Sequence, residues 1–310
     1  MRYLVTGGAG FIGHHLVRAL LDRGDEVVVL DDLSTGQMER LAEVLDRIAM
    51  IEGSILDDEA LDAAMDGCTG VLHQAALASV ARSVRDPLTS NEVNVTGTVR
   101  VMLSAARGGV SRVVFAGSSS VYGSGGELPR RESQRCEPAS PYATTKLAAE
   151  AYVHSMGQLL EIETASLRYF NVFGPGQDPD SEYAAVVPRF VTAALKGDEP
   201  VIFGDGTTTR DFTFIEDVVQ ANLRALDVPS LDALTCNIGS GDRYSLVDLV
   251  ETIGDAVGRR LVPSFTAPRA GDVHDSQADI TVAQERLGYE PRVGLADGIA
   301  RTVAWYRAAS

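Results

Sequence analysis

A tyrosine followed four residues later by a lysine is the pair in this chain whose types and spacing could do chemistry. Residues 140–146 read SPYATTK, and Lys146 is one of only two lysines in the sequence. The Ser-Pro pair predicts a helix start, so Tyr142 and Lys146 would share one face of its first turns. A phenol has a pKa of about 10, and an adjacent ammonium favours its phenolate. The spacing therefore indicates Tyr142 as an acid–base residue and Lys146 as the group that lowers its pKa.

Taken alone, this pair is weak evidence. Tyr-x-x-x-Lys occurs often by chance, and an exposed tyrosine beside a solvated lysine is then the simpler interpretation. The assignment depends on the elements that would have to position the pair.

The first of these elements is a glycine-rich turn at the start of the chain. A short apolar strand over residues 2–6 leads into Gly7, Gly10 and Gly13, and an apolar helical pattern follows. Glycines at this spacing let the backbone turn tightly and approach a pyrophosphate, while the helix N-terminus offers free N–H groups to its oxygens. Strand, glycine turn and helix in this order predict a dinucleotide site.

An acidic pair ends the second predicted strand, residues 26–30. Asp31 and Asp32 follow that strand about 20 residues after the glycines, where a carboxylate accepts hydrogen bonds from an adenosine ribose. A negative charge there repels a 2′-phosphate, so we expect NAD rather than NADP. A polar turn is the alternative interpretation.

Strands and helices keep alternating along the first half of the chain. We expect strands near 49–52, 70–73, 112–116 and 163–167, and helices near 59–65 and 87–106, followed by helices near 216–226, 246–257, 282–287 and 295–306. Such repeats predict an α/β fold with a doubly wound parallel (Rossmann) sheet, whose ligands bind beyond the carboxyl ends of the strands. We expect an NAD-binding domain over 1–168, with a returning segment around 205–240, and a smaller α/β substrate-binding domain over 169–310.

Composition limits the classes of partner. The chain has 310 residues, 45% of them hydrophobic, a net charge of −16 and a pI near 4.7. This acidity argues against nucleic acid or anionic membrane as a partner, because both need clustered basic residues. It fits a high-salt cytoplasm and a GC-rich genome equally well. With no apolar run near ~18 residues and no leader pattern at the start, we expect a soluble cytoplasmic protein.

No metal site is expected. Cys68, Cys136 and Cys236 lie far apart without a Cys-x-x-Cys motif, and we interpret them as reduced thiols. His73 is most simply a histidine satisfied within its strand. Arg210 and Arg269 stand in loop contexts where they could bind a diphosphate, although each taken singly is more typical of a surface salt bridge.

These motifs together resemble the extended short-chain dehydrogenase/reductase family over nearly the whole chain. Within it, the chain looks most like the NAD-dependent UDP-sugar 4-epimerases, closest to the UDP-N-acetylglucosamine 4-epimerase branch. The likeness rests on the glycine turn, Ser118, the Tyr142/Lys146 pair, RYFN at 168–171 and TRD at 209–211, and much of it is carried by residues 167–175, 177–179 and 183–188.

The resemblance implies a role for each matching position. Tyr142 takes and returns the proton of the sugar O4, Ser118 shares that hydrogen bond, and Lys146 holds the nicotinamide ribose, while hydride moves between sugar C4 and NAD. The implied cofactor-binding residues are Gly7, Gly10, Phe11, Ile12, Gly13, Asp31, Asp32, Ser54, Ile55, Gln74, Ala75, Ala76, Asn94, Tyr142, Lys146 and Tyr169. The implied substrate-binding residues are Ser118, Ser119, Tyr142, Asn171, Val187, Phe203, Arg210, Arg269, Asp272 and Ser276.

Departures from related subfamilies narrow the activity. Related 4,6-dehydratases carry an Asp-Glu pair where this chain has Ser119 and Ser120, and related glucuronate decarboxylases carry a glutamate at Ser120. Glucuronate epimerases usually have threonine where Asn171 stands. Ala78 replaces a lysine of some galactose epimerases. A UDP-glucuronate 4-epimerase or decarboxylase, another 4-keto-forming enzyme, and an NAD-binding sensor or scaffold remain the alternatives.

Two finer expectations follow from the resemblance. The helices near 87–106 and 145–159 carry apolar residues on more than one side and form a four-helix dimer interface in the family, so we expect a homodimer. Ser276 falls where hexose-restricted epimerases have tyrosine and N-acetylhexosamine epimerases have a small residue. We therefore expect UDP-N-acetylglucosamine and UDP-N-acetylgalactosamine to be interconverted, and UDP-glucose and UDP-galactose to be accepted as well.

Overall fold

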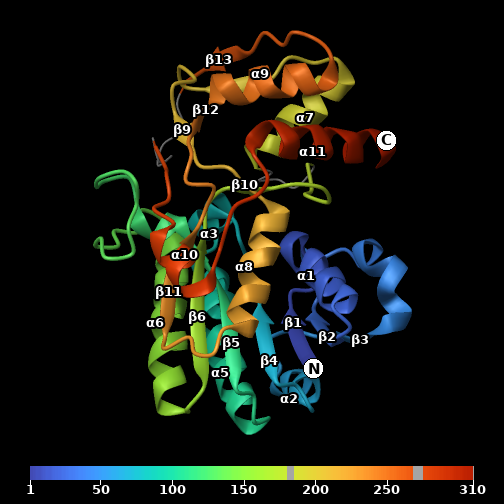
Figure 1. The fold of residues 1–310 in the computed structure, drawn as a ribbon, viewed down its shortest axis with the longest axis vertical. Helices are drawn as coiled ribbons and strands as arrows, with labels where there is room; N and C mark the ends of the chain where they lie inside the picture. The colour runs from blue at the N-terminus through green and yellow to red at the C-terminus, as the bar shows by residue number, and fades with distance from the viewer. Residues whose placement is uncertain (180–184, 268–274, 310) are drawn as a thin grey trace.

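A seven-stranded parallel sheet forms the base of the protein in the computed structural model, which describes residues 1–179, 185–267 and 275–309. The strand order is β11-β6-β5-β4-β1-β2-β3 (Figure 1). The strands are β1 (Arg2–Thr6), β2 (Glu26–Asp31), β3 (Ile48–Glu52), β4 (Gly70–His73), β5 (Arg112–Ser118), β6 (Glu163–Tyr169) and β11 (Leu234–Ile238). This order confirms the predicted doubly wound α/β sheet.

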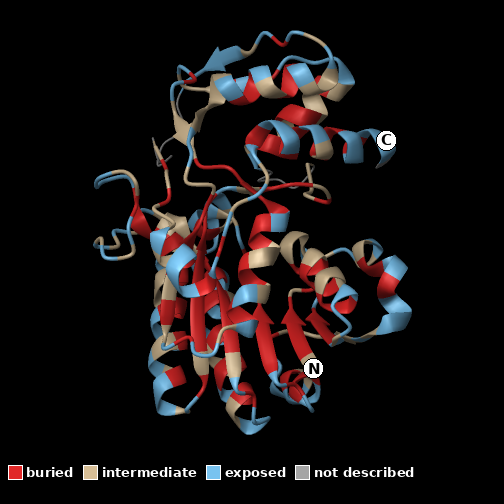
Figure 2. Cartoon of the chain, in the orientation of Figure 1, coloured by how far each residue is buried: buried red, intermediate tan, exposed pale blue. Residues whose placement is uncertain are grey.

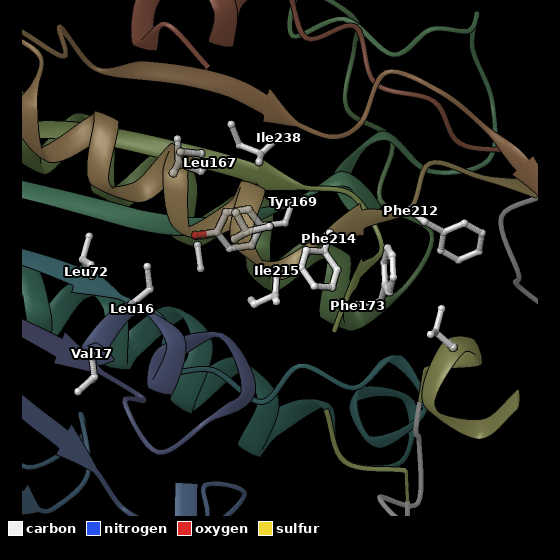
Figure 3. Packing of buried hydrophobic residues seen from close by; sticks show 14 of the residues in the cluster. Leu16, Val17, Leu72, Leu167, Tyr169, Phe173, Phe212, Phe214, Ile215 and Ile238 are labelled. Atoms are coloured by element: carbon white, nitrogen blue, oxygen red, sulfur yellow. The ribbon is translucent and has the colours of Figure 1, made fainter. Parts of the chain in front are cut away.

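Helices cover both faces of the sheet. One face carries α1 (Phe11–Asp22), α8 (Ile215–Asp227) and α10 (Thr281–Leu287), and the other carries α2 (Asp58–Met65), α5 (Gly97–Arg107) and α6 (Pro141–Leu159). Most of the central strands are therefore buried throughout (Figure 2), which explains their runs of apolar residues. Figure 3 shows Leu16 and Val17 of α1 near Leu72 of β4 in the first of these layers.

A smaller group of elements lies beyond the carboxyl ends of the strands (Figure 1). It contains α7 (Val186–Lys196), α9 (Leu246–Val257) and α11 (Leu295–Ala309), and three two-stranded pairings. These are β7 (Val172–Phe173) with β10 (Thr213–Phe214), β9 (Thr209–Arg210) with β12 (Tyr244–Ser245), and β8 (Val201–Phe203) with β13 (Ser264–Thr266). Phe173, Phe212 and Phe214 pack edge to face where this group joins the sheet (Figure 3).

Short elements connect the layers. They are η1 (Met38–Arg47), α3 (Val80–Arg85), α4 (Pro87–Asn91) and η3 (Ser119–Tyr122). The helix expected over 87–106 runs through α4 and α5, but a π-helical turn, Glu92–Thr96, interrupts it. Such turns often mark functional positions, because they redirect side chains and backbone groups.

The sequence left some elements unassigned. Neither α7 nor β11 was expected, although β11 lies within the predicted returning segment. The domain boundary near residue 168 stays a prediction. In the described part of the chain, no helix combines the length and the apolar character needed to cross a membrane.

Candidate active site

The start of α6 presents the tyrosine and lysine as the sequence predicted. Ser140 caps the helix, its Oγ accepting from the Ala143 N–H at 3.2 Å, and Pro141 occupies the first helical position. One helical turn separates Tyr142 from Lys146, which places both on the side of α6 that packs on β5.

Lys146 is buried and fixed to the sheet. Its Nζ donates to the Ala116 carbonyl of β5 at 2.9 Å and lies 4.9 Å from the centre of the Phe115 ring. Burial lowers the pKa of Lys146 to about 8. An ammonium has three N–H groups, so Lys146 keeps donors for a ligand beyond the one that binds Ala116.

Tyr142 is half-buried, and its pKa differs from our expectation. Burial raises the pKa of Tyr142, while a hydrogen bond with Ser118 acts in the opposite direction. The expected lowering by Lys146 is therefore not found in the protein alone: desolvation of the phenolate has the largest effect on the pKa, and the effect that opposes it is the hydrogen bond with Ser118. Ser118, at the end of β5, also bonds the Ser120 hydroxyl, with the two Oγ atoms 2.8 Å apart.

Hydroxyl groups hold the backbone of Tyr142 on both sides. Its N–H donates to Ser83 Oγ of α3 at 2.9 Å, and its carbonyl accepts from Thr145 Oγ1 at 2.8 Å. Thr145 in turn accepts from Asn94 Nδ2 at 3.0 Å. Ser83 is not predicted from the sequence, since a serine in a short helix carries no pattern of its own.

The glycine turn fits a dinucleotide. Gly7 has a φ of +68°, and a Cβ on it would lie 2.8 Å from the Ala75 backbone, while a Cβ on Gly13 would lie 2.1 Å from the Gly7 carbonyl. Among the described residues, no side chain caps α1 at Gly10. The first N–H groups of α1 therefore remain open to the oxygens of a diphosphate.

Asp31 braces this turn and is more than a polar turn residue. Its Oδ2 accepts from the Ala9 N–H and its Oδ1 from the Leu33 N–H, both at 2.9 Å. Burial raises the pKa of Asp31, and these backbone hydrogen bonds counteract the rise. Each oxygen keeps a lone pair for a ribose hydroxyl. The neighbouring Asp32 is exposed and bonds Ser34.

The other predicted cofactor residues lie along the same edge of the sheet. Phe11 and Ile12 form the first turn of α1, Ser54 and Ile55 follow β3, and Gln74, Ala75 and Ala76 follow β4. Gln74 bonds the hydroxyl of Tyr169 at 3.3 Å. Asn94 is buried, and its amide already bonds the Leu77 N–H, the Leu77 carbonyl and Thr145. The structure therefore gives Asn94 protein partners at both ends of its amide.

A cavity of about 160 Å³ opens beside Ser118 and gathers several predicted substrate residues. Ser119, Asn171, Arg210 and Ser276 line it together with Ser120, Gly123, Arg130, Phe170 and Asp275. Asn171 Nδ2 donates to Ser276 Oγ at 3.1 Å and to the Asp211 carbonyl at 2.8 Å. The last five residues of the lining were not predicted as site residues; only Ser120, adjacent to the predicted serines, had a signal.

Besides Ser118 and Tyr142, two predicted substrate residues that the structure describes are not in this lining. Val187 is buried in the core side of α7, and Phe203 lies under the Arg189 guanidinium, 5.7 Å from the ring centre. Arg269 and Asp272 lie outside the described residues. All four assignments stay predictions.

Comparison with known proteins places the chain among enzymes of one family. The NAD dependent epimerase/dehydratase family matches residues 3–239. A UDP-glucose 4-epimerase of Mycolicibacterium smegmatis is 43% identical, over 99% of each chain.

Solved structures agree over the whole chain. A Thermotoga maritima UDP-glucose 4-epimerase with UDP-glucose superposes with a TM-score of 0.95 at 36% identity, covering 100% of this chain and 99% of that one. A Methanobrevibacter ruminantium UDP-N-acetylglucosamine 4-epimerase with UDP-N-acetylmuramic acid gives 0.95 at 34% identity, with the same coverage. Like the glycine turn and the Tyr142/Lys146 pair, these findings show that the chain belongs to the NAD dependent epimerase/dehydratase family and uses NAD as its cofactor.

Proposed function

We propose that this protein is a UDP-sugar 4-epimerase that interconverts UDP-N-acetylglucosamine with UDP-N-acetylgalactosamine, and UDP-glucose with UDP-galactose. The observation that carries the proposal is the position of Tyr142 and Ser118. They are hydrogen-bonded to each other where β5 ends, and the adjoining Ser119 and Ser120 line the cavity.

Each member of the site has a defined task in this reaction. When bound, NAD accepts a hydride from sugar C4 and returns it. Tyr142 removes the O4 proton and later gives it back, Ser118 shares the hydrogen bond to O4, and Lys146 holds the nicotinamide ribose. The 4-keto sugar would rotate within the cavity, so that its opposite face receives the returning hydride. No second substrate is consumed.

Ser276 supports the choice of sugar. The residue is only 9% exposed, its Oγ accepts from Asn171, and it lines the cavity. A serine there leaves room that a phenol ring would fill. An acetamido group fits this room, and a plain hydroxyl at the same carbon is too small to be rejected.

Turnover of four UDP-sugars tests the proposal. The purified protein with NAD is incubated with UDP-N-acetylglucosamine, UDP-N-acetylgalactosamine, UDP-glucose or UDP-galactose, and the products are separated by chromatography. We expect each sugar to approach equilibrium with its 4-epimer. Loss of water would indicate a dehydratase. Conversion of UDP-glucuronate alone, supplied as a fifth substrate, would indicate a glucuronate epimerase or, with release of carbon dioxide, a decarboxylase. Bound NAD without any conversion would indicate a sensor or scaffold.

We also propose that two copies of the chain form a homodimer through the α3–α6 side. Exposed large apolar side chains lie on these mutually packed helices, namely Val80, Val84, Leu88, Leu103, Tyr152 and Leu159. A helix face of this kind is stabilised by burial against a second copy. Sedimentation should give the mass of two chains at micromolar concentration, and Leu88→Asp should shift it toward one; a wild-type mass of one chain refutes the dimer.

A further inference from the structure

A buried histidine outside the proposed chemistry lies between two threonines. His73 ends β4 and is 1% exposed. Its Nδ1 lies 2.7 Å from Thr6 Oγ1 of β1, and its Nε2 lies 3.0 Å from Thr98 Oγ1 of α5. The ring therefore joins the strand that leads into the glycine turn to the helix that follows the π-helical turn.

The neighbouring hydrogen bonds fix which ring nitrogen carries the proton. Thr98 donates its hydroxyl hydrogen to the Asn94 carbonyl at 2.7 Å, so its oxygen must accept from His73 Nε2–H. Nδ1 is then the acceptor for the Thr6 hydroxyl, whose oxygen accepts from the Ala75 N–H at 3.3 Å. Burial, together with the charge of Lys146, lowers the pKa of His73 to about 3, so the ring is neutral at pH 7.

A second run of hydrogen bonds starts at the side chain of Asn94 and leads to the catalytic helix, while the first run ends at the backbone carbonyl of the same residue. Asn94 Nδ2 donates to Thr145 Oγ1 at 3.0 Å, and Thr145 donates to the Tyr142 carbonyl at 2.8 Å. Each run has its donors on the same side: one leads from the Ala75 N–H to the Asn94 carbonyl, and the other from the Asn94 amide to the Tyr142 carbonyl. Bonds aligned in one direction polarise and strengthen one another in a low dielectric within each run, and the covalent frame of Asn94 joins the two.

We propose that His73 is a positioning residue, and that Thr6, His73, Thr98, Asn94 and Thr145 form a polar relay that fixes Tyr142 relative to the dinucleotide cradle. All five side chains are at most 4% exposed. The proposal rests on the proposed roles of Tyr142 and of the glycine turn. His73 exchanges no proton with substrate, and its task is to hold two elements at one spacing.

The location of the relay explains why that spacing matters. A Cβ on Gly7 would touch the Ala75 backbone, so the cofactor turn and the start of the relay are in direct contact. At the other end, the relay holds the peptide of Tyr142. Proton and hydride transfer require the phenol and the cofactor to approach the same sugar carbon, and a misplacement of about 1 Å is enough to lower such rates about a hundredfold.

A double-mutant cycle between the two ends tests the relay. Thr6→Val and Thr145→Val each replace one hydroxyl by a methyl group of similar size. We expect each to lower kcat about tenfold with KM for the UDP-sugar nearly unchanged. The double variant should fall little further than either single one, because the relay is already broken. Thr6→Ser and Thr145→Ser restore the hydroxyls and should recover most of the rate.

A matched control shows what independent sites do. Thr164 is a buried threonine of β6 that bonds His154 and lies outside the relay. Effects of separated, unconnected sites multiply to within about a factor of two. The fold losses in kcat caused by Thr6→Val and Thr164→Val should therefore multiply in the double variant. If the losses caused by Thr6→Val and Thr145→Val multiply as well, the hydroxyls only stabilise the fold and the relay is wrong.

NAD affinity provides a readout that needs no turnover. Each variant is titrated with NAD by calorimetry, and circular dichroism confirms that it is folded. The double-mutant cycle is then repeated with the NAD binding constant in place of kcat. We expect Thr145→Val to weaken NAD binding about as much as Thr6→Val does. The double variant should bind NAD little more weakly than either single variant. If the wild type binds NAD but converts no UDP-sugar, the proposed function fails, and the relay is still judged by this cycle. Additive effects on NAD affinity reject the relay even in an active enzyme.

Discussion

The cofactor side and the substrate side of the active site are built differently. On the cofactor side, Lys146, Asn94 and Asp31 are buried and each bonds backbone groups of the sheet edge. On the substrate side, the cavity walls come from segments far apart in sequence, tied by short pairings such as that of Thr209 with Asp275. The difference indicates that the groups proposed to do the chemistry are held rigidly, while the residues proposed to select the sugar can change without disturbing them.

Among the substitutions on the cofactor side, Tyr142→Phe should lower kcat most. The phenylalanine keeps the ring but removes the proton acceptor, so we expect kcat to fall by about two to four orders of magnitude. Calorimetry should show NAD binding close to wild type. An active Tyr142→Phe enzyme would refute the assignment of the base.

Lys146→Met should damage both halves of the catalytic step. It removes the ammonium expected to hold the nicotinamide ribose and to favour the phenolate, so both NAD affinity and kcat should fall. Lys146→Arg is the control for charge alone, and because guanidinium is planar and larger, we expect it to rescue little.

Lys146→Met should also change how the stability of the protein depends on pH. The folded-state pKa of Lys146 is about 8, below the ordinary 10.5, because of burial. Between these values the unfolded chain binds more protons than the folded one, so the stability contribution of Lys146 rises with pH. In the absence of NAD, the free energy of unfolding of Lys146→Met should therefore exceed that of the wild type by most at pH 7. This excess should shrink progressively from pH 8 to 10.5. Urea unfolding measures it, and a difference that is constant with pH contradicts the burial effect.

Ser276→Tyr should alter the substrate side alone. A phenol at this position overlaps the acetamido group, so kcat/KM for the two acetylated sugars should fall about tenfold or more, while UDP-glucose turnover changes little. Ser276→Ala keeps the volume small and should retain both activities. If wild type rejects UDP-N-acetylglucosamine, another residue sets the specificity.

Asp31→Asn should give the smallest change, in cofactor affinity. The amide loses the charge and one of the two acceptors that bond Ala9 and Leu33, so we expect NAD to bind about tenfold more weakly. The affinity for NADP should fall less, since the repulsion of its 2′-phosphate is reduced. Asp32→Asn is exposed and serves as the control; an equal effect there would show that overall charge, and not the position of Asp31, matters.

The local structure of the cofactor side could be predicted from the sequence because local patterns encode it, while the roles of its residues stay predictions. The Ser140 cap, the glycine turn and Asp31 each follow from residues close together in the chain, and parallel strands bring their carboxyl ends to one edge. The family resemblance added Ser118 and Ser276, which no local pattern identifies.

The rest required the fold itself. Phe170, Arg130 and Asp275 meet at the cavity through two-residue strands and isolated bridges that have no periodicity to detect. The pKa of Tyr142 was predicted in the wrong direction for the protein alone, since spacing shows the neighbouring charge but not the degree of burial. His73 was interpreted as satisfied, which it is, but its partners on β1 and α5 are visible only in three dimensions.

The place of Ser276 in the chain bears on the order in which the protein is made. The last strand of the large sheet ends at Ile238, so every strand that supports the dinucleotide cradle leaves the ribosome before Asp275 and Ser276 do. Chains fold from the N-terminus during synthesis. A nascent chain therefore contains every strand of its cradle while its sugar pocket still lacks a wall, and the part of the sheet face that α10 covers waits for the same late segment.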